Sequence, residues 1–200
     1  MKKILSILFY LIPATAFLQP STDATAPYYQ NLGYPNIKLR LPDSTTIYTK
    51  ENLPKDKTVV IIFFSPECEH CQAEATAMIE KKDSLQNLFM AWNANMVDDF
   101  SHVKEFYYKY GFDKFSNIVL GKEIDYYLPL FYRIENTPYA AVYKNGKLFA
   151  EFRNSLSLEN LIAINYNTYK PIIDYSVYKP QPVVIEPQKP VKKKKKKRSR

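Results

Sequence analysis

The stretch VVIIFFSPECEHC, residues 59–71, decides the fold class of this chain. Its first six residues form an uninterrupted run of β-branched and aromatic side chains, the pattern of a strand buried on both faces of a mostly parallel sheet. Good helix formers dominate residues 69–83, and neither Gly nor Pro interrupts them. The sequence therefore predicts a strand, a turn and a helix, with both cysteines at the turn.

Cys68 and Cys71 are the only cysteines of the chain. Free backbone N–H groups and the positive end of the helix dipole stabilise a thiolate at a helix start, so we expect Cys68 to be a nucleophile. Cys71 is placed to close a disulfide onto Cys68 and release a captured group. A positive charge on His70 would favour the Cys68 thiolate, whereas Glu67 and Glu69 would disfavour it. The net effect on the redox potential is open at this point.

An inert disulfide and a metal site are the other interpretations of this pair. A bridge across so short a loop removes little entropy from the unfolded chain, which makes a purely structural role the weaker explanation. Zinc usually takes four ligands, and the chain offers only His70 and His102 beside the cysteines. We therefore expect no metal and no bound cofactor, with the Cys68–Cys71 pair itself as the redox-active group.

Shorter patterns outside this stretch extend the prediction to a whole domain. We expect Asp98 and Asp99 to cap a helix rather than bind a metal, and His102 to lie at the start of that helix, at the surface. Asn145-Gly146 between apolar runs is the strongest short-range signal of a β-hairpin. The order of elements predicts an α/β domain over residues 37–170, with a mixed central sheet and helices on both faces. The expected elements are strands at 37–41, 88–92 and 118–120, helices at 98–110, 125–133 and 157–166, and a hairpin of 139–143 with 147–152.

The N-terminal residues have the features of a signal peptide. Lys2 and Lys3 precede an apolar run over residues 4–12, and Ala14-Thr15-Ala16 has the small-x-small form that a signal peptidase accepts. We expect residues 1–16 to be removed, with an uncleaved anchor as the alternative, and residues 17–36 to be a leader with little regular structure. Export would place the cysteines where disulfides persist, most simply the periplasm, with membrane association or secretion as alternatives.

The basic charge of the chain belongs to its C-terminal tail. The formal net charge is +8, yet the last twelve residues hold nine Lys and Arg side chains and no acid, which leaves −1 for the remainder and −3 without Lys2 and Lys3. Residues 171–200 are rich in Pro and Lys and predict a disordered basic tail. Such a tail could contact an anionic membrane or lipopolysaccharide, or have no dedicated partner. Nucleic acid is the least expected partner of an exported protein, and the lysine run holds no aromatic residue that could stack on bases.

Four features, in this order, resemble the thioredoxin-like thiol-disulfide oxidoreductases, and within them the exported TlpA/ResA-like group. They are the apolar strand at 59–64, the CEHC motif at 68–71, Thr137-Pro138 before a strand, and the turn at 144–146. Glu74 matches the C-x-x-C-x-x-E of that group, and residues 37–48 look like its extra N-terminal hairpin. The resemblance covers residues 35–168. It implies a thioredoxin-like three-layer fold, with helices on both faces of the sheet.

The resemblance also implies the roles of the site residues. Cys68 and Cys71 would be catalytic, Pro138 would be a cis-proline facing them, and the backbone of Thr137 would pair with an extended substrate segment. His70, Glu67, Glu69 and Glu74 would tune the pKa of the cysteines. Two positions depart from the family pattern: Ile62 stands where thioredoxins place a buried acid, and Glu67 replaces the usual tryptophan.

The function that follows from the resemblance is an exported enzyme that exchanges disulfides with protein thiol or disulfide substrates. The reductase direction is favoured, and a reductase would need an electron donor in the membrane. The rival is a non-catalytic binding module of the same fold whose polybasic tail adheres to an anionic surface. The departures at Ile62 and Glu67 favour this rival.

Overall fold

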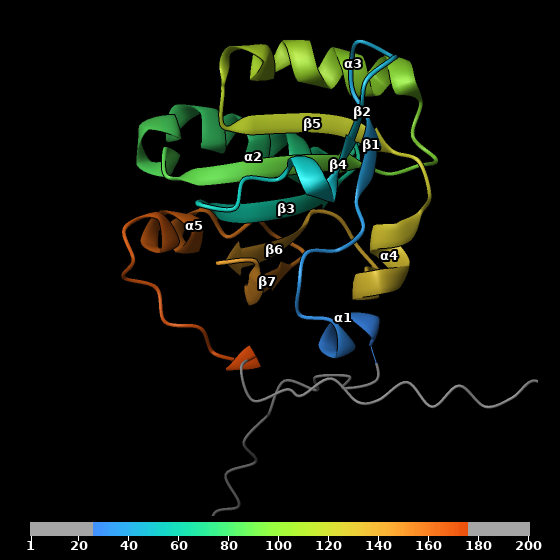
Figure 1. The fold of residues 1–200 in the computed structure, drawn as a ribbon. Helices are drawn as coiled ribbons and strands as arrows, with labels where there is room; N and C mark the ends of the chain where they lie inside the picture. The colour runs from blue at the N-terminus through green and yellow to red at the C-terminus, as the bar shows by residue number, and fades with distance from the viewer. Residues whose placement is uncertain (1–25, 176–200) are drawn as a thin grey trace, which may run out of the picture.

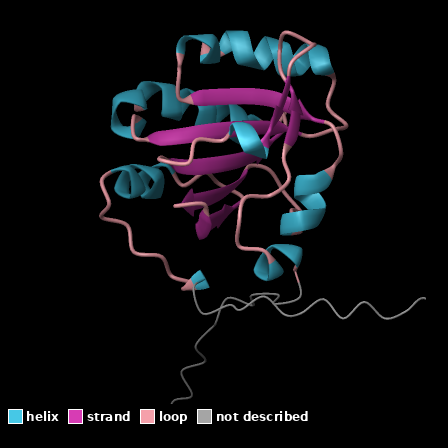
Figure 2. Cartoon of the chain, in the orientation of Figure 1, coloured by secondary structure: helices cyan, strands magenta, loops and turns pink. Residues whose placement is uncertain are grey.

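The computed structural model describes residues 26–175, which form a seven-stranded sheet with helices on both faces (Figures 1 and 2). The predicted signal peptide and residues 176–200 of the predicted tail lie outside the described residues. Between residues 26 and 175, no helix is long and apolar enough to cross a membrane. The strands are β1 (Lys38–Arg40), β2 (Ile47–Thr49), β3 (Thr58–Phe64), β4 (Leu88–Ala94), β5 (Ile118–Glu123), β6 (Tyr139–Lys144) and β7 (Lys147–Arg153).

The sheet is mixed, with the order β2-β1-β5-β4-β3-β6-β7. Strands β3, β4 and β5 run parallel to one another at its centre, whereas β6 and β7 on one side and β1 and β2 on the other are antiparallel. All of β3 after Thr58 is buried, as its apolar sequence predicts. The predicted hairpins of β1 with β2 and of β6 with β7 are both confirmed.

Side chains of β3 alternate between two apolar cores, one on each face of the sheet. Its even-numbered residues pack with α2 (Glu69–Glu80), α3 (Phe100–Lys109) and α5 (Leu158–Asn165). Its odd-numbered residues pack with α1 (Pro27–Gln30) and α4 (Tyr127–Tyr132). The predicted three layers, helices over both faces of a mixed sheet, are therefore confirmed. Single 3₁₀ turns complete the described elements: η1 (Lys50–Asn52), η2 (Lys82–Leu85) and η3 (Phe112–Lys114).

Several elements differ in length from their sequence patterns, among them the helix after the cysteines and the strand at 118–120. The helix predicted over residues 69–83 ends at Glu80, and the chain continues into the 3₁₀ turn η2. The strand predicted over 118–120 reaches Glu123, because its second half pairs with β1. Gly121 permits this pairing: a Cβ there would lie 2.8 Å from the backbone oxygen of Arg40. Long-range pairing of this kind leaves little trace in the local sequence.

Residues 26–36 belong to the folded domain, which corrects the prediction of a leader with little regular structure. Tyr28 and Tyr29, in α1, are each 3% exposed. The Tyr28 hydroxyl donates to Glu151 Oε1 at 3.2 Å, and the Tyr29 ring stacks on Tyr175 with 6.2 Å between the ring centres. Burial of these rings stabilises a segment whose composition suggested a loop. Since Tyr175 is also buried, packing extends beyond both predicted domain limits, residues 37 and 170.

Candidate active site

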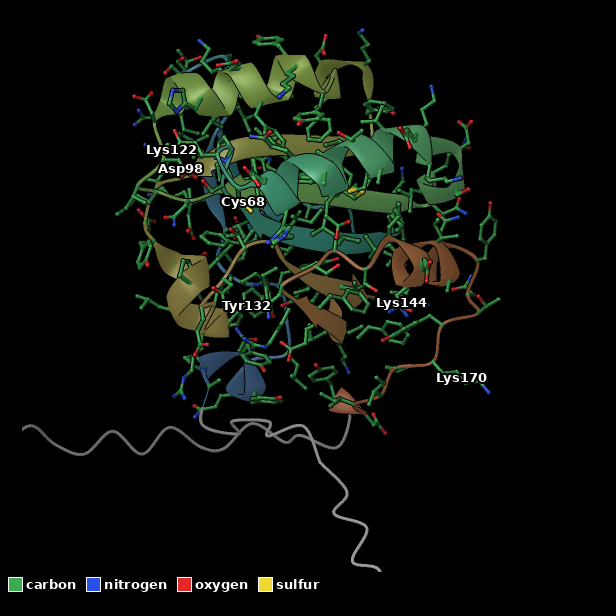
Figure 3. The ribbon with its side chains drawn as sticks, turned by 180° about the vertical axis from the view of Figure 1, so that it is seen from behind. Cys68, Asp98, Lys122, Tyr132, Lys144 and Lys170 are labelled. Atoms are coloured by element: carbon green, nitrogen blue, oxygen red, sulfur yellow. The ribbon has the colours of Figure 1, made fainter. Side chains whose placement is uncertain are left out.

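The two cysteines lie where β3 ends and α2 begins. Figure 3 labels Cys68 at this point. Cys68 is the N-cap residue of α2, and its Sγ accepts a hydrogen bond from the backbone N–H of Cys71 at 3.3 Å. Cys68 is half-buried and Cys71 is fully buried, and both are free thiols. A substrate can therefore approach Cys68, whereas Cys71 is reachable only from inside the site.

Thr137 and Pro138 lie directly against Cys68. They precede β6, which pairs antiparallel with β3, and the Cys68 thiol donates to the Thr137 backbone oxygen at 3.6 Å. The Thr137–Pro138 peptide bond is cis, as the resemblance implied. The fold thus brings together the CEHC motif and a residue 69 positions away in the sequence.

The surroundings of Cys68 favour its thiolate. Partial burial acts to raise its pKa, but hydrogen bonds from the Cys71 side chain, the Thr137 side chain and the backbone amides of Cys71 and His70 outweigh it. The pKa of Cys68 is therefore lower than usual for a cysteine. Nucleophilic attack at neutral pH requires the thiolate, so this environment suits an attacking thiol.

Cys71 has the opposite environment. Burial, followed by the side chain and charge of the neighbouring Cys68, raises the pKa of Cys71 to about 12. The backbone amide of Ser65 and the side chain of Thr137 lower it by a smaller amount. The site therefore holds one activated and one protonated thiol, which can act in succession.

Alkylation should distinguish the accessible Cys68 thiol from the buried Cys71 thiol. In the folded protein at pH 7, iodoacetamide is expected to modify Cys68 and to leave Cys71 unmodified, because only Cys68 is both accessible and partly ionised. The rate at Cys68 should rise with pH and level off below the usual cysteine range. Peptide mass spectrometry measures both sites, and the protein in denaturant, where both should react alike, is the control. Comparable modification of Cys71 in the folded protein would contradict the assignment.

The charged residues of the motif are at the surface. Glu69 and His70 lie in the exposed first turn of α2, where the backbone amide of His70 supports the Cys68 thiolate. The Glu67 carboxylate pairs with Nδ1 of His102, which projects from α3, at 2.8 Å. The imidazole of His102 therefore lies against the carboxylate of the residue that precedes Cys68.

Glu74 makes contacts away from the cysteines. Its Oε1 accepts hydrogen bonds from the Ser155 hydroxyl at 2.8 Å and from the Leu156 amide at 3.2 Å. Glu74 thereby fastens α2 to the segment that leads into α5. No hydrogen bond or ion pair described for residues 26–175 joins it to either cysteine, so its tuning of their pKa stays a prediction.

Asp98 occupies a position that its sequence context did not indicate. Asp99 alone caps α3, accepting from the Ser101 amide at 2.7 Å, whereas Asp98 Oδ1 accepts from the Ser65 hydroxyl at 2.9 Å. Ser65 directly follows β3, and Asp98 lies shortly after β4. Because the carboxyl ends of neighbouring parallel strands meet at one edge of a sheet, strand order could have indicated this contact.

A polar cavity of about 370 Å³ opens beside Ser65 and Thr137, whose backbone oxygens accept from the amide and the thiol of Cys68. Ser65, Asp98 and Thr137 line it, together with Tyr126 and Asn136 from the segments around α4. Figure 3 shows Asp98 close to Lys122, on the same side of the molecule as Cys68. The cavity therefore adjoins two residues that contact Cys68, although neither cysteine lines it.

Solved structures share this architecture. A secreted disulfide oxidoreductase of Mycobacterium tuberculosis, homologous to DsbE of E. coli, is 18% identical, with a TM-score of 0.54 over 66% of this chain and 96% of that one. DsbF from the same organism is 20% identical, with a TM-score of 0.54 over 70% and 98% of the two chains. An exposed lipoprotein thioredoxin of Streptococcus pneumoniae is 16% identical, with a TM-score of 0.52 over 66% and 98%.

These likenesses show that the chain has the thioredoxin-like fold that the CEHC motif and its surroundings suggested. No family model and no curated protein matches the sequence. The fold is therefore established by structural likeness alone.

Proposed function

We propose that this protein is an exported thiol-disulfide oxidoreductase that exchanges disulfides with protein substrates through Cys68 and Cys71. The observation that carries the proposal is the division of the two thiols: an accessible one with a lowered pKa at a helix start, and a buried one with a raised pKa three residues later. The disulfide oxidoreductases of the same fold support it.

The first step is the attack of the Cys68 thiolate on a substrate disulfide. An S–S bond forms between Cys68 and one substrate sulfur, while the other substrate sulfur leaves as a thiolate. Thr137, whose carbonyl already accepts from the Cys68 thiol, lies where the substrate backbone would pair with the protein. A substrate segment in extended conformation would pair with the backbone of Thr137, which lies just before β6.

The second step is the attack of Cys71 on the mixed disulfide. A Cys68–Cys71 bond forms, the bond between Cys68 and the substrate breaks, and the substrate sulfur departs with the electron pair. The substrate is reduced and the protein is oxidised. No metal or organic cofactor takes part in this exchange.

We propose the reductase direction because acidic side chains flank the nucleophile. Glu67 and Glu69, both exposed, act against the hydrogen bonds that lower the pKa of Cys68 and hence limit the stabilisation of the reduced form. A reductase has to be reduced again, and in an exported protein a membrane electron donor would supply the electrons.

Export is supported by the signal-like residues 1–16 and by the structural neighbours described as secreted or exposed. The periplasm is the compartment that we propose. The lysine-rich tail would bring the protein to an anionic membrane surface or to lipopolysaccharide by charge attraction.

The reduction potential of the Cys68–Cys71 pair tests this function. The protein is equilibrated in glutathione buffers and its free thiols are trapped and counted. A value near that of thioredoxin, about −270 mV, is expected for a reductase, and a value near −120 mV would indicate a disulfide donor instead. A pair that does not exchange at all would refute the enzyme and leave a binding module of the same fold.

A further inference from the structure

In the second step the Cys71 thiol has to lose its proton, and neither cysteine can accept it. Cys71 is fully buried and its pKa is about 12, so at neutral pH it is almost entirely protonated. Only a thiolate attacks a disulfide efficiently. A base has to accept the Cys71 proton, and the position where thioredoxins carry a buried acid is Ile62 here.

Two carboxylates line the polar cavity next to Ser65 and Thr137, and Asp98 is the less exposed of them, the other being Glu135. The Oδ1 of Asp98 accepts from Ser65, while its Oδ2 is buried and has no hydrogen-bond partner among the described residues. Burial raises its pKa above the usual aspartate range, Glu67 adds to this effect, and Ser65 and Lys122 oppose it. A carboxylate with a raised pKa is a stronger base near neutral pH than an exposed one.

Ser65 and Thr137 act on the Cys71 thiol and also line the cavity that Asp98 lines, so they connect the two groups. The Ser65 backbone amide and the Thr137 side chain both act on the Cys71 thiol, and Ser65 also donates its hydroxyl to Asp98. Ser65, Thr137 and Asp98 line the same cavity, whose volume of about 370 Å³ is ample for water. The unpartnered Oδ2 of Asp98 can therefore accept a proton that is relayed by water.

We propose that Asp98 is the proton acceptor of the resolving step, taking the proton of Cys71 through water in this cavity. This inference rests on the proposed function. The Cys71 S–H bond breaks and its proton passes to the Asp98 carboxylate; the Cys71 sulfur bonds to Cys68, and the substrate sulfur leaves with the electron pair of the broken disulfide. Asp98 then returns the proton to solvent. Besides Asp98, the charged groups at this site are Glu67, Lys122 and Glu135.

Rapid mixing of the reduced full-length protein with dithiobis(nitrobenzoate) separates the two steps. The coloured thiolate is released once when Cys68 attacks and once more when Cys71 resolves the mixed disulfide. For Asp98→Asn, the first phase should keep its rate and the second should slow by roughly 10²-fold, the usual contribution of a general base. The second phase of the parent protein should be nearly flat above the pKa of Asp98, whereas that of Asp98→Asn should rise about tenfold per pH unit.

Asp99→Asn is the matched control, because it makes the same change one residue away and asparagine caps a helix as well as aspartate does. It should leave both phases and the pH profile unchanged. Equal slowing of both phases in Asp98→Asn, or an unaltered second phase, would overturn the role of Asp98. Absence of the first phase in the parent protein would instead refute the proposed function.

Discussion

Replacing Cys71 with serine is expected to halt the reaction at the mixed disulfide. Cys68 keeps its position at the start of α2 and still attacks, because the backbone N–H of residue 71 remains its hydrogen-bond donor. Serine fills nearly the same volume as the buried thiol but does not attack disulfides. The substrate therefore stays covalently bound to Cys68 through one disulfide bond per protein molecule.

Non-reducing electrophoresis and mass spectrometry measure this complex. Cys68→Ser is the control and should form no complex, because the buried Cys71 is neither accessible nor ionised at neutral pH. The Cys71→Ser variant should also recover the natural substrates of the protein from the compartment where it works. Turnover at the parental rate by Cys71→Ser would refute the two-step mechanism.

Replacing Glu123 with alanine is expected to lower the free energy of unfolding by about 2–4 kcal/mol. Glu123 ends β5, is 2% exposed, and its Oε1 accepts hydrogen bonds from the backbone amides of Tyr127 and Leu128 at 2.8 and 2.7 Å. These amides begin α4 and would lose their partner. Denaturant unfolding followed by circular dichroism measures the change. Glu135→Ala, at an exposed position, should change stability by less than about 0.5 kcal/mol.

Glu123 also makes the stability of the folded protein depend on pH. Burial raises the pKa of Glu123 above its ordinary range, although the amides of Leu128 and Tyr127 act to lower it. The folded state therefore binds this proton more tightly than the unfolded state, and the contribution of Glu123 to stability falls as the pH rises from the ordinary glutamate pKa through the raised one. Unfolding midpoints across that window should show this slope in the parent protein and not in Glu123→Ala. An unchanged slope would show that another group causes it.

Local patterns predicted the elements that position the cysteines. The apolar run at 59–64, the helix after Cys71 and the Asn145-Gly146 hairpin each depend on neighbouring residues, so the sequence reveals them directly. Thr137 and Pro138 could be assigned to the site only through the resemblance, because no local pattern links them to a motif 69 residues earlier.

Contacts between distant segments were the part that the sequence did not reveal. The hydroxyl of Tyr28 donates to Glu151 in β7, a partner more than a hundred residues away in the sequence. Asp98 and Asp99 look equivalent in the sequence, yet Asp99 caps a helix and Asp98 meets Ser65 where two neighbouring strands end. The order of strands in the sheet decides such contacts, and the pattern of either strand alone does not reveal it.

The stacking of Tyr29 on Tyr175 has a mechanical consequence. The described domain begins and ends at this one place, so pulling on either flanking segment loads the same point rather than stretching the sheet between two points. Cys68 lies on a different part of the surface, away from this place (Figure 3).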